Sequence, residues 1–290
     1  MRPVLKLIRP YQYLKNSFVF LGPLFAHQWD LVTLSQASLV FLAFCCMASA
    51  VYVLNDIMDI EADRAHPVKC LRPLPNGTIS LRTAKQLLCG LVTLSMAFSL
   101  LVSSWVTLFV TAYLVINILY SWRLKHVVIL DVFLISSGFM LRILAGTVGL
   151  GIAPSAWLLL CGLMVTLFLG FAKRRAELLM LDAIRSTNNG LTRPVLDDYS
   201  PEMLEQFIAV TAACTIISYG LYTVSPQTLA IHGSDNLIYT LPFVTYGIFR
   251  YLFLLHRRAK GNDTAKDLFQ DYHMLMTVVA WVITTLWVLA

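Results

Sequence analysis

Charged side chains are scarce in this chain of 290 residues, since Asp, Glu, Lys and Arg make up only 13% of it. That is about half of their usual share in globular proteins. Hydrophobic residues make up 58%. This composition excludes an ordinary soluble domain and predicts an all-α polytopic membrane protein, with residues 1–290 as a single transmembrane domain.

Cysteine is also sparse and shows no framework spacing. The chain has six cysteines, most of them within apolar runs, and none needs a disulfide or a metal to explain it. The basic residues near the N-terminus precede a hydrophobic segment that has no small-residue cleavage site. We therefore expect no cleavable signal peptide.

Basic residues are missing from every second loop. The net charge of +6 would suit a nucleic-acid partner, but the 22 Lys and Arg, with the exception of Arg142, gather at the N-terminus and in alternate loops. This is the positive-inside pattern of a membrane protein. It predicts membrane lipids rather than nucleic acid as surroundings, and a bacterial inner membrane location with the N-terminus cytoplasmic and the C-terminus outside. A homo-oligomer is compatible with the sequence.

Long apolar runs supply the spanning helices, each of which needs about 20 residues. We predict nine of them, at residues 14–29, 34–54, 84–102, 104–121, 128–149, 155–174, 204–224, 236–255 and 273–290. The ionisable clusters recur at the cytoplasmic ends of several of these helices. We therefore expect one polar site at the cytoplasmic membrane face, above an apolar cavity.

The strongest chemical signal follows the second predicted span. Asp56, Asp59 and Asp63 are spaced i, i+3 and i+7, so on a continuing helix they share one face. Three close carboxylates favour a hard divalent cation such as Mg²⁺, which commonly brings substrate phosphates with it. Lys69 and Arg72 follow and could hold phosphate oxygens. The alternative is a solvated acidic helix end, which we disfavour because ionisable groups at a membrane helix cost energy.

A second cluster ends the sixth predicted span, at Lys173, Arg174, Arg175 and Glu177. Lys173 and Glu177 are one turn apart and can face the same site. The two arginines are bidentate phosphate binders. An ordinary basic flank of a membrane helix is the alternative interpretation.

Single basic residues complete the candidate set. Arg142 lies deep in the fifth predicted span and should face the bundle interior with a partner rather than lipid. Lys125 lies in the loop before that span. Lys15 and Asn16 open the first span, where Lys15 could equally be a snorkelling lysine.

The arrangement Asn55-Asp56-x-x-Asp59-x-x-x-Asp63 after the second of nine spans resembles the first Asp-rich motif of the UbiA superfamily of intramembrane prenyltransferases. The resemblance runs nearly end to end. It implies a UbiA-like helical bundle, with Asp56, Asp59 and Asp63 as catalytic and metal-binding residues for Mg²⁺. It also places Asn55 in the pocket, together with Lys15 and Asn16.

The second Asp-rich motif of that family is absent, and Lys173-Arg174-Arg175-Ala-Glu177 stands in its place. Together with His66-Pro67-x-Lys69-x-x-Arg72-Pro73, Leu124-Lys125-His126, Gly138-Phe139-x-Leu141-Arg142 and the segment 250–271, this departure is similar to the decaprenyl-phosphate phosphoribosyltransferase branch.

That resemblance implies transfer of 5-phosphoribose from phosphoribosyl diphosphate to a polyprenyl phosphate, towards lipid-linked arabinose. It also implies phosphate contacts for Lys69, Arg72, Lys173 and Arg174. Glu177 would either orient ribose hydroxyls or complete the metal shell.

Two other functions stay open. The first is an aromatic prenyltransferase of the same superfamily, which the missing second Asp motif disfavours. The second is a transporter for a lipid or phosphorylated solute, which would place its ionisable residues near the bilayer midplane rather than at one face.

Overall fold

The computed structural model describes residues 2–65, 69–185, 198–257 and 271–289. Every regular element within these ranges is a helix, which confirms the all-α prediction. The chain divides into two compact units. Unit 1 comprises Met1–Trp122 and Leu141–Ala153, and unit 2 comprises Arg123–Met140 and Pro154–Ala290. That residues 1–290 act as one catalytic domain stays a prediction.

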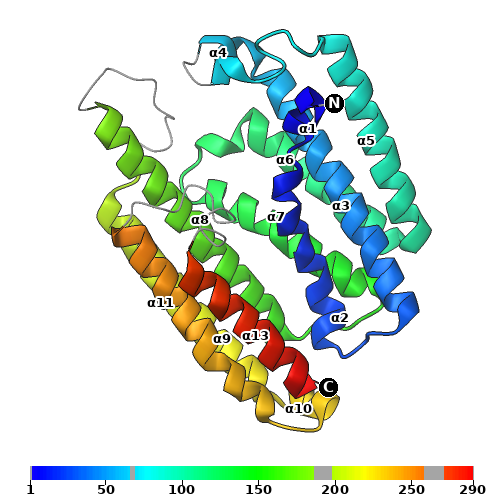
Figure 1. Cartoon of the computed structure of the whole chain (residues 1–290), viewed down its shortest axis with the longest axis vertical. Coiled ribbons are helices and arrows are strands. Elements are labelled where there is room, and N and C mark those ends of the chain that lie inside the picture. The colour runs from blue at the N-terminus through cyan, green and yellow to red at the C-terminus, as the bar shows by residue number, and fades with distance from the viewer. Residues whose placement is uncertain (1, 66–68, 186–197, 258–270, 290) are drawn as a thin grey trace. The chain divides into compact units, whose positions relative to one another are not determined.

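Unit 1 is built around the long helix α3. Its elements are α1 (Arg2–Ile8), η1 (Pro10–Phe20), α2 (Leu21–Phe25), α3 (Leu31–Met58), α4 (Ile60–Ala65), η2 (Lys69–Leu71), α5 (Leu81–Val102), α6 (Ser104–Trp122), the end of α7 (Leu130–Gly146) and η4 (Val148–Leu150). Helix α3 packs against η1, α5 and α6, and Figure 1 shows α3 and α5 side by side. Phe44, Met47, Val51 and Val110 are among the buried side chains of this core.

Two long helices of unit 1, α3 and α5, begin at side chains that satisfy their first backbone N–H groups. The Asp30 carboxylate accepts from the N–H groups of Val32 and Thr33, each at 3.0 Å, and starts α3. Ser80 starts α5, where its hydroxyl accepts from the Thr83 N–H at 3.1 Å. These caps explain why α3 and α5 begin where polar residues precede an apolar run.

Two glycines allow a very close backbone contact within unit 1. A Cβ on Gly22 would lie 2.0 Å from the carbonyl oxygen of Gly146, and a Cβ on Gly146 would lie 1.9 Å from that of Val19. No side chain fits at either position. The segment that joins η1 to α2 is therefore held directly against the end of α7, which also carries Arg142.

Unit 2 holds the second half of the chain. Its elements are η3 (Leu124–His126), the first part of α7 (Leu130–Gly146), α8 (Ala156–Arg185), α9 (Pro201–Thr223), α10 (Pro226–His232), η6 (Asn236–Thr240), α11 (Leu241–Arg257) and α13 (Tyr272–Leu289). Helices α8 and α9 pack along each other, and α11 contacts both α9 and α13 (Figure 1). Phe168, Phe171, Leu204 and Tyr251 lie in the shared core.

The described residues contain eight helices that are long and apolar enough to cross a membrane, by length and composition alone. They cover eight of the nine predicted spans. The first predicted span, 14–29, is instead the 3₁₀ helix η1 followed by the five-residue helix α2. Hydropathy reports how apolar a segment is and not its helical geometry, so it could not distinguish a 3₁₀ helix from an α-helix. The count of nine spans stays a prediction.

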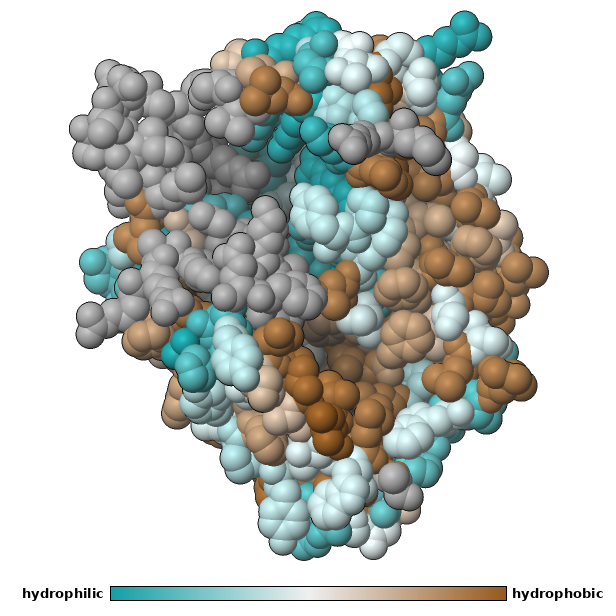
Figure 2. All heavy atoms as spheres, viewed as in Figure 1, coloured by the Kyte–Doolittle hydropathy of each residue, from teal (hydrophilic) through white to brown (hydrophobic). Residues whose placement is uncertain are grey.

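The surface of unit 1 separates by polarity. Large apolar side chains of α5 and α6 are exposed, among them Leu100, Leu101, Trp105 and Leu108. Figure 2 shows this side of α5 as hydrophobic and the end that carries α4 as hydrophilic. Exposed apolar surface of this kind suits lipid rather than water, as expected for a multi-pass membrane protein.

Candidate active site

The acidic residues of unit 1 lie where α3 ends. Helix α3 stops at Met58, Asp59 forms a turn, and α4 begins at Ile60. Helical hydrogen bonding continues through the turn, because the Asp59 N–H donates to Asn55 O at 2.9 Å and the Asp63 N–H donates to Asp59 O at 2.8 Å. The predicted continuous helix is therefore interrupted at one residue only.

Asp56 and Asp63 converge on one guanidinium group. Arg72 Nη1 lies 2.6 Å from Asp63 Oδ2 and 3.3 Å from Asp56 Oδ1, and both acids are 2% exposed. Lys69 Nζ lies 3.8 Å from Asp63 Oδ1. A buried carboxylate needs a cation to remain charged, so the structure uses Lys69 and Arg72 for this purpose. Their predicted contacts with substrate phosphate stay a prediction.

Arg9 was not singled out from the sequence, and it belongs to the same group. Its Nη2 lies 2.7 Å from Asp56 Oδ1, and its guanidinium stacks over the Tyr52 ring, 4.8 Å from the centroid. Arg9 links α1 to η1 with φ of 52°, a left-handed conformation that is rare outside glycine. The available signal was a basic residue directly before Pro10, at the break between two helices. We call Asp56, Asp63, Arg9, Lys69 and Arg72 the carboxylate cluster.

The predicted site residues Asn16 and Arg142 contact each other inside unit 1. Arg142 Nε donates to Asn16 Oδ1 at 2.7 Å, and Arg142 Nη2 donates to the Tyr113 hydroxyl at 3.2 Å. The guanidinium also lies over the rings of Tyr113 and Phe44, 4.6 and 5.3 Å from their centroids. Arg142 is 5% exposed. This confirms that it faces the interior with a partner rather than lipid.

The remaining predicted residues of unit 1 lie along the same helices. Asn55 Oδ1 accepts from the Ser121 hydroxyl at 2.7 Å, which joins the end of α3 to the end of α6. Lys15 is half-buried in η1, one residue before Asn16. Their predicted substrate contacts stay predictions.

Unit 2 carries a separate ion-pair group around Arg174. Arg174 Nε lies 2.6 Å from Asp131 Oδ2, and Arg174 Nη1 contacts Glu177. The Tyr199 hydroxyl donates to Asp131 Oδ1 at 2.8 Å and accepts from the Ile129 N–H at 2.6 Å. We call these residues the Arg174 network. Burial raises the pKa of the Tyr199 hydroxyl, so it stays protonated and able to donate.

The other bases of the 173–175 triplet differ in their surroundings. Lys173 Nζ lies 3.9 Å from Glu177 Oε1, and its side chain is 43% exposed. Arg175 Nη2 lies 2.6 Å from Glu205 Oε1. Lys125 is half-buried in η3. The ion pairs at Arg174 and Arg175 give both arginines structural contacts, and a phosphate-binding role for the triplet stays a prediction.

Part of the predicted pattern lies outside the described residues. His66 and Pro67, which precede Lys69 and Arg72 in that pattern, fall there, as do residues 258–270 of the 250–271 segment. The two ends of the 250–271 segment are described, and they form a bidentate ion pair. Arg250 Nε lies 3.0 Å from Asp271 Oδ1, and Arg250 Nη2 lies 2.8 Å from Oδ2.

Asp56 and Asp63 have oxygen donors of the kind that a divalent metal needs. Among the described residues, no group of three His, Cys, Asp or Glu side chains is close enough to hold one. Two of the three predicted carboxylates do share one cation, and their oxygens are the donors that Mg²⁺ prefers. The donor chemistry of Asp56 and Asp63 therefore fits a hard metal ion, with Asp59 adjacent in the chain.

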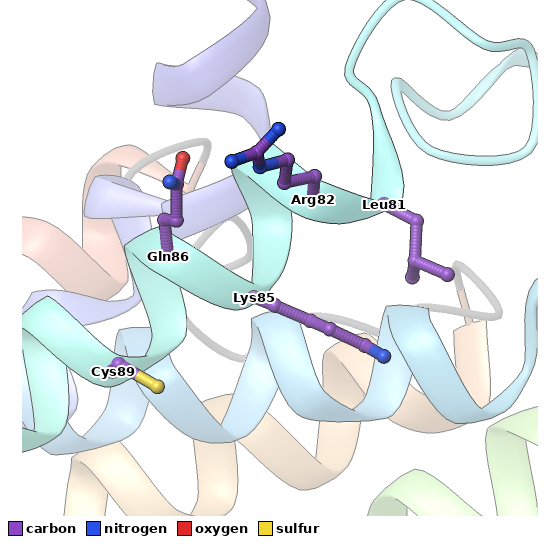
Figure 3. Close-up of a pocket in the computed structure, with 5 residues that line it drawn as sticks. All are labelled: Leu81, Arg82, Lys85, Gln86 and Cys89. Carbon is purple, nitrogen blue, oxygen red and sulfur yellow. The ribbon is translucent and has the colours of Figure 1, made fainter.

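Figure 3 shows a hollow along the first turns of α5. Leu81, Arg82, Lys85, Gln86 and Cys89 line it, all from this one helix. None of the predicted site residues is among them. Two basic side chains on an exposed helix surface are ordinary at a membrane boundary, so the hollow carries no assignment.

Comparison with known proteins gives a family and named relatives. Residues 16–279 match the model of the UbiA prenyltransferase family. A decaprenyl-phosphate phosphoribosyltransferase of Corynebacterium glutamicum is 33% identical over 98% of this chain and 84% of its own length. A protein of the same name from Mycolicibacterium smegmatis is 30% identical over 96% of this chain and 90% of its own.

Solved structures share the fold. A UbiA homolog from Archaeoglobus fulgidus bound to GPP and Mg²⁺ is similar with a TM-score of 0.73 at 18% identity, covering 99% of both chains. A digeranylgeranylglyceryl phosphate synthase gives a TM-score of 0.66 at 20% identity, covering 98% of both. At these identities the likeness extends to the helical architecture alone.

Proposed function

The chain belongs to the UbiA prenyltransferase family and is a transferase, and from this premise we propose that it transfers 5-phosphoribose from phosphoribosyl diphosphate to a polyprenyl phosphate. The named relatives, at 30–33% identity over nearly the whole chain, support this choice. We further propose that the reaction leads towards lipid-linked arabinose. We place the enzyme in a bacterial inner membrane, with its N-terminus and its site on the cytoplasmic side.

The observation that carries the proposal is the pair of buried carboxylates held by arginine. Asp56 and Asp63 share Arg72 at 3.3 and 2.6 Å, at the polar end of a membrane-spanning helix. A leaving diphosphate needs both a metal and guanidinium donors, and the carboxylate cluster contains the residue types for both. A prenyl diphosphate donor would make the same demand, so the choice of phosphoribosyl diphosphate rests on the named relatives.

We propose that Asp56, Asp59 and Asp63 hold Mg²⁺, which when bound would neutralise the charge that develops on the departing diphosphate. Arg72 and Lys69 then donate to diphosphate oxygens that the metal leaves uncovered. Arg9 keeps Asp56 ionised and oriented through its 2.7 Å contact.

The bond changes are simple. An oxygen of the polyprenyl phosphate bonds to C1 of the ribose, and the bond from C1 to the diphosphate breaks, with the electron pair leaving on the diphosphate. A phosphate monoester is already anionic near neutral pH. The acceptor therefore needs no general base.

Residues outside the carboxylate cluster have narrower proposed roles. We propose that Lys173 binds a substrate phosphate. It contacts Glu177, and its side chain is the most exposed of the three bases at 173–175. Arg174 would assist through the position it gives Glu177. Neutralising Lys173 as Lys173→Gln should raise the KM for one of the two substrates several-fold. An unchanged KM for both substrates would contradict phosphate binding by Lys173 and leave the basic triplet with a structural role only.

A transfer assay tests the function. Membranes containing the overexpressed protein receive phosphoribosyl diphosphate labelled in the ribose, a polyprenyl phosphate and Mg²⁺. Label should enter the organic phase, and both EDTA and Asp59→Asn should prevent this. Absence of transfer, together with prenylation of 4-hydroxybenzoate from a prenyl diphosphate, would establish the aromatic prenyltransferase instead. Accumulation of unreacted substrate in vesicles would establish transport.

A further inference from the structure

Arg72 holds one positive charge between two buried carboxylates. Its Nη1 lies 2.6 Å from Asp63 Oδ2 and 3.3 Å from Asp56 Oδ1, while each acid is 2% exposed. Two carboxylates this close and this buried repel each other unless a cation compensates them. The Arg72 side chain itself is 33% exposed, so the compensating cation is in contact with solvent although the acids are not.

Arg72 contacts one oxygen of each of the two carboxylates that we propose as metal ligands. Mg²⁺ binds oxygen at about 2.0–2.1 Å and repels a guanidinium group on the same oxygen. Asp56 Oδ1 also accepts from Arg9 Nη2 at 2.7 Å, so two guanidinium groups already meet at this oxygen. A metal ion bound to both Asp56 and Asp63 places a second positive charge beside this guanidinium, and the repulsion favours displacement of Arg72 from at least one acid.

The backbone around Arg72 is held independently of this ion pair. Its N–H donates to Lys69 O at 3.0 Å, and its carbonyl accepts from the Asn76 N–H at 3.1 Å. The Ile79 N–H donates to Pro73 O at 3.0 Å, which closes the same loop directly after Arg72. Displacement therefore requires a rotamer change of one long side chain, and diphosphate oxygens are strong acceptors for the guanidinium that moves.

We propose that Arg72 is an exchangeable counter-cation, which neutralises Asp56 and Asp63 until the metal binds and then transfers to the diphosphate. The proposal rests on the proposed function, because it takes Mg²⁺ and a diphosphate as the ligands. Metal alone breaks the Arg72 contacts without replacing them, whereas metal with diphosphate gives the guanidinium a new partner. The two ligands must therefore strengthen each other's binding by the same factor.

Metal titration of the purified protein in detergent tests this exchange. Mn²⁺ is the probe, because it takes the same oxygen ligands as Mg²⁺, and inorganic diphosphate is the second ligand. The test variant is Arg72→Gln. The matched control is Arg64→Gln, which removes the same charge one residue from Asp63. Arg64 is exposed and donates to a backbone carbonyl rather than to a carboxylate.

Without diphosphate, Arg72→Gln should bind Mn²⁺ about tenfold more tightly than the wild type, a usual size for coupling between two ligands. The control Arg64→Gln should stay within about twofold of the wild type. With diphosphate present, the wild-type Kd for Mn²⁺ should fall about tenfold, while that of Arg72→Gln should fall much less.

Equal Mn²⁺ affinity of Arg72→Gln and Arg64→Gln, or no Mn²⁺ binding by any of these proteins, would overturn the exchange. If Arg72→Gln does not stay monodisperse, Arg72→Lys serves in its place, and the same order is expected at smaller amplitude because one ammonium does not span both acids. The wild-type response to diphosphate needs no variant at all. An intact exchange without phosphoribosyl transfer would contradict only the proposed function, and transfer without exchange would contradict only this inference.

Discussion

Both units of the chain place arginine against acid at the end of a long helix, but the two groups differ in their access to solvent. In unit 1 the cation Arg72 is 33% exposed over buried acids. In unit 2 the Arg174 side chain is 2% exposed and its partner Asp131 is 0% exposed. A half-exposed cation can exchange for another ligand, whereas a fully buried one cannot leave without stranding a charge. The residue types alone do not separate these two cases.

Removal of Arg174 should have the largest effect on stability, because it leaves Asp131 as a buried, uncompensated carboxylate. We expect Arg174→Ala to cost about 3–5 kcal/mol, seen as a large drop in Tm and loss of monodisperse protein in detergent. The double variant Arg174→Gln/Asp131→Asn removes both charges and should recover most of the loss. A stable Arg174→Ala protein would show that the buried Arg174 is no more necessary for folding than a partly exposed cation such as Arg72.

Neutralising an acid of unit 1 should instead spare the fold and abolish turnover. We expect Asp56→Asn and Asp59→Asn each to lose several kcal/mol of transition-state stabilisation, more than about 10²-fold in rate, while both elute normally from size exclusion. Glu61→Gln is the control, since Glu61 is an exposed acid in the same segment. Full activity of Asp59→Asn would remove that residue from the metal assignment.

The hydroxyl of Tyr199 gives a smaller test of rigidity in unit 2. Tyr199→Phe removes the partner of Asp131 Oδ1 and of the Ile129 N–H, and Ile129 has a left-handed φ of 68° that is unfavourable for a β-branched residue. We expect a loss of about 1–3 kcal/mol in thermal unfolding, with KM values unchanged. A changed KM at unchanged Tm would indicate that this network contacts substrate.

The smallest effect is expected at Asp30, an exposed acid that contrasts with the buried ones. Its hydrogen bonds to Thr33 lower the pKa of its carboxyl group. A lowered folded pKa means that the charge stabilises the fold above the unfolded pKa of about 3.9 and ceases to do so as pH falls through the folded pKa. The Tm difference between wild type and Asp30→Asn, which keeps the cap, should therefore be small at pH 7 and vanish at acidic pH. A difference that grows at low pH would contradict this.

The sequence could predict the helices and the acidic motif because both depend on local pattern. Apolar runs predicted eight helices that the structure contains, and the i, i+3, i+7 spacing brought Asp56 and Asp63 to one guanidinium. An apolar run also predicted a spanning helix at 14–29, where the structure instead has η1, a 3₁₀ helix packed against α3, followed by α2.

The electrostatic partners were harder to predict, since they depend on tertiary contacts. Arg9 reaches Asp56 across 47 positions of the chain, and Asp131 meets Arg174 across 43. Nothing near Arg174 in the sequence distinguishes a buried arginine from the more exposed Lys173 beside it. Charge type is visible in a sequence, but burial of that charge is decided by the whole fold.

The contact between Gly22 and Gly146 also sets limits on how this chain can vary. Because each missing side chain leaves room for a backbone carbonyl, the two positions depend on each other, and even alanine at one of them must push two segments apart. In a saturation library these sites should reject all nineteen alternatives while the exposed leucines of α5 accept many. The two glycines are thus constrained together by the close backbone contact, although neither is a proposed catalytic residue.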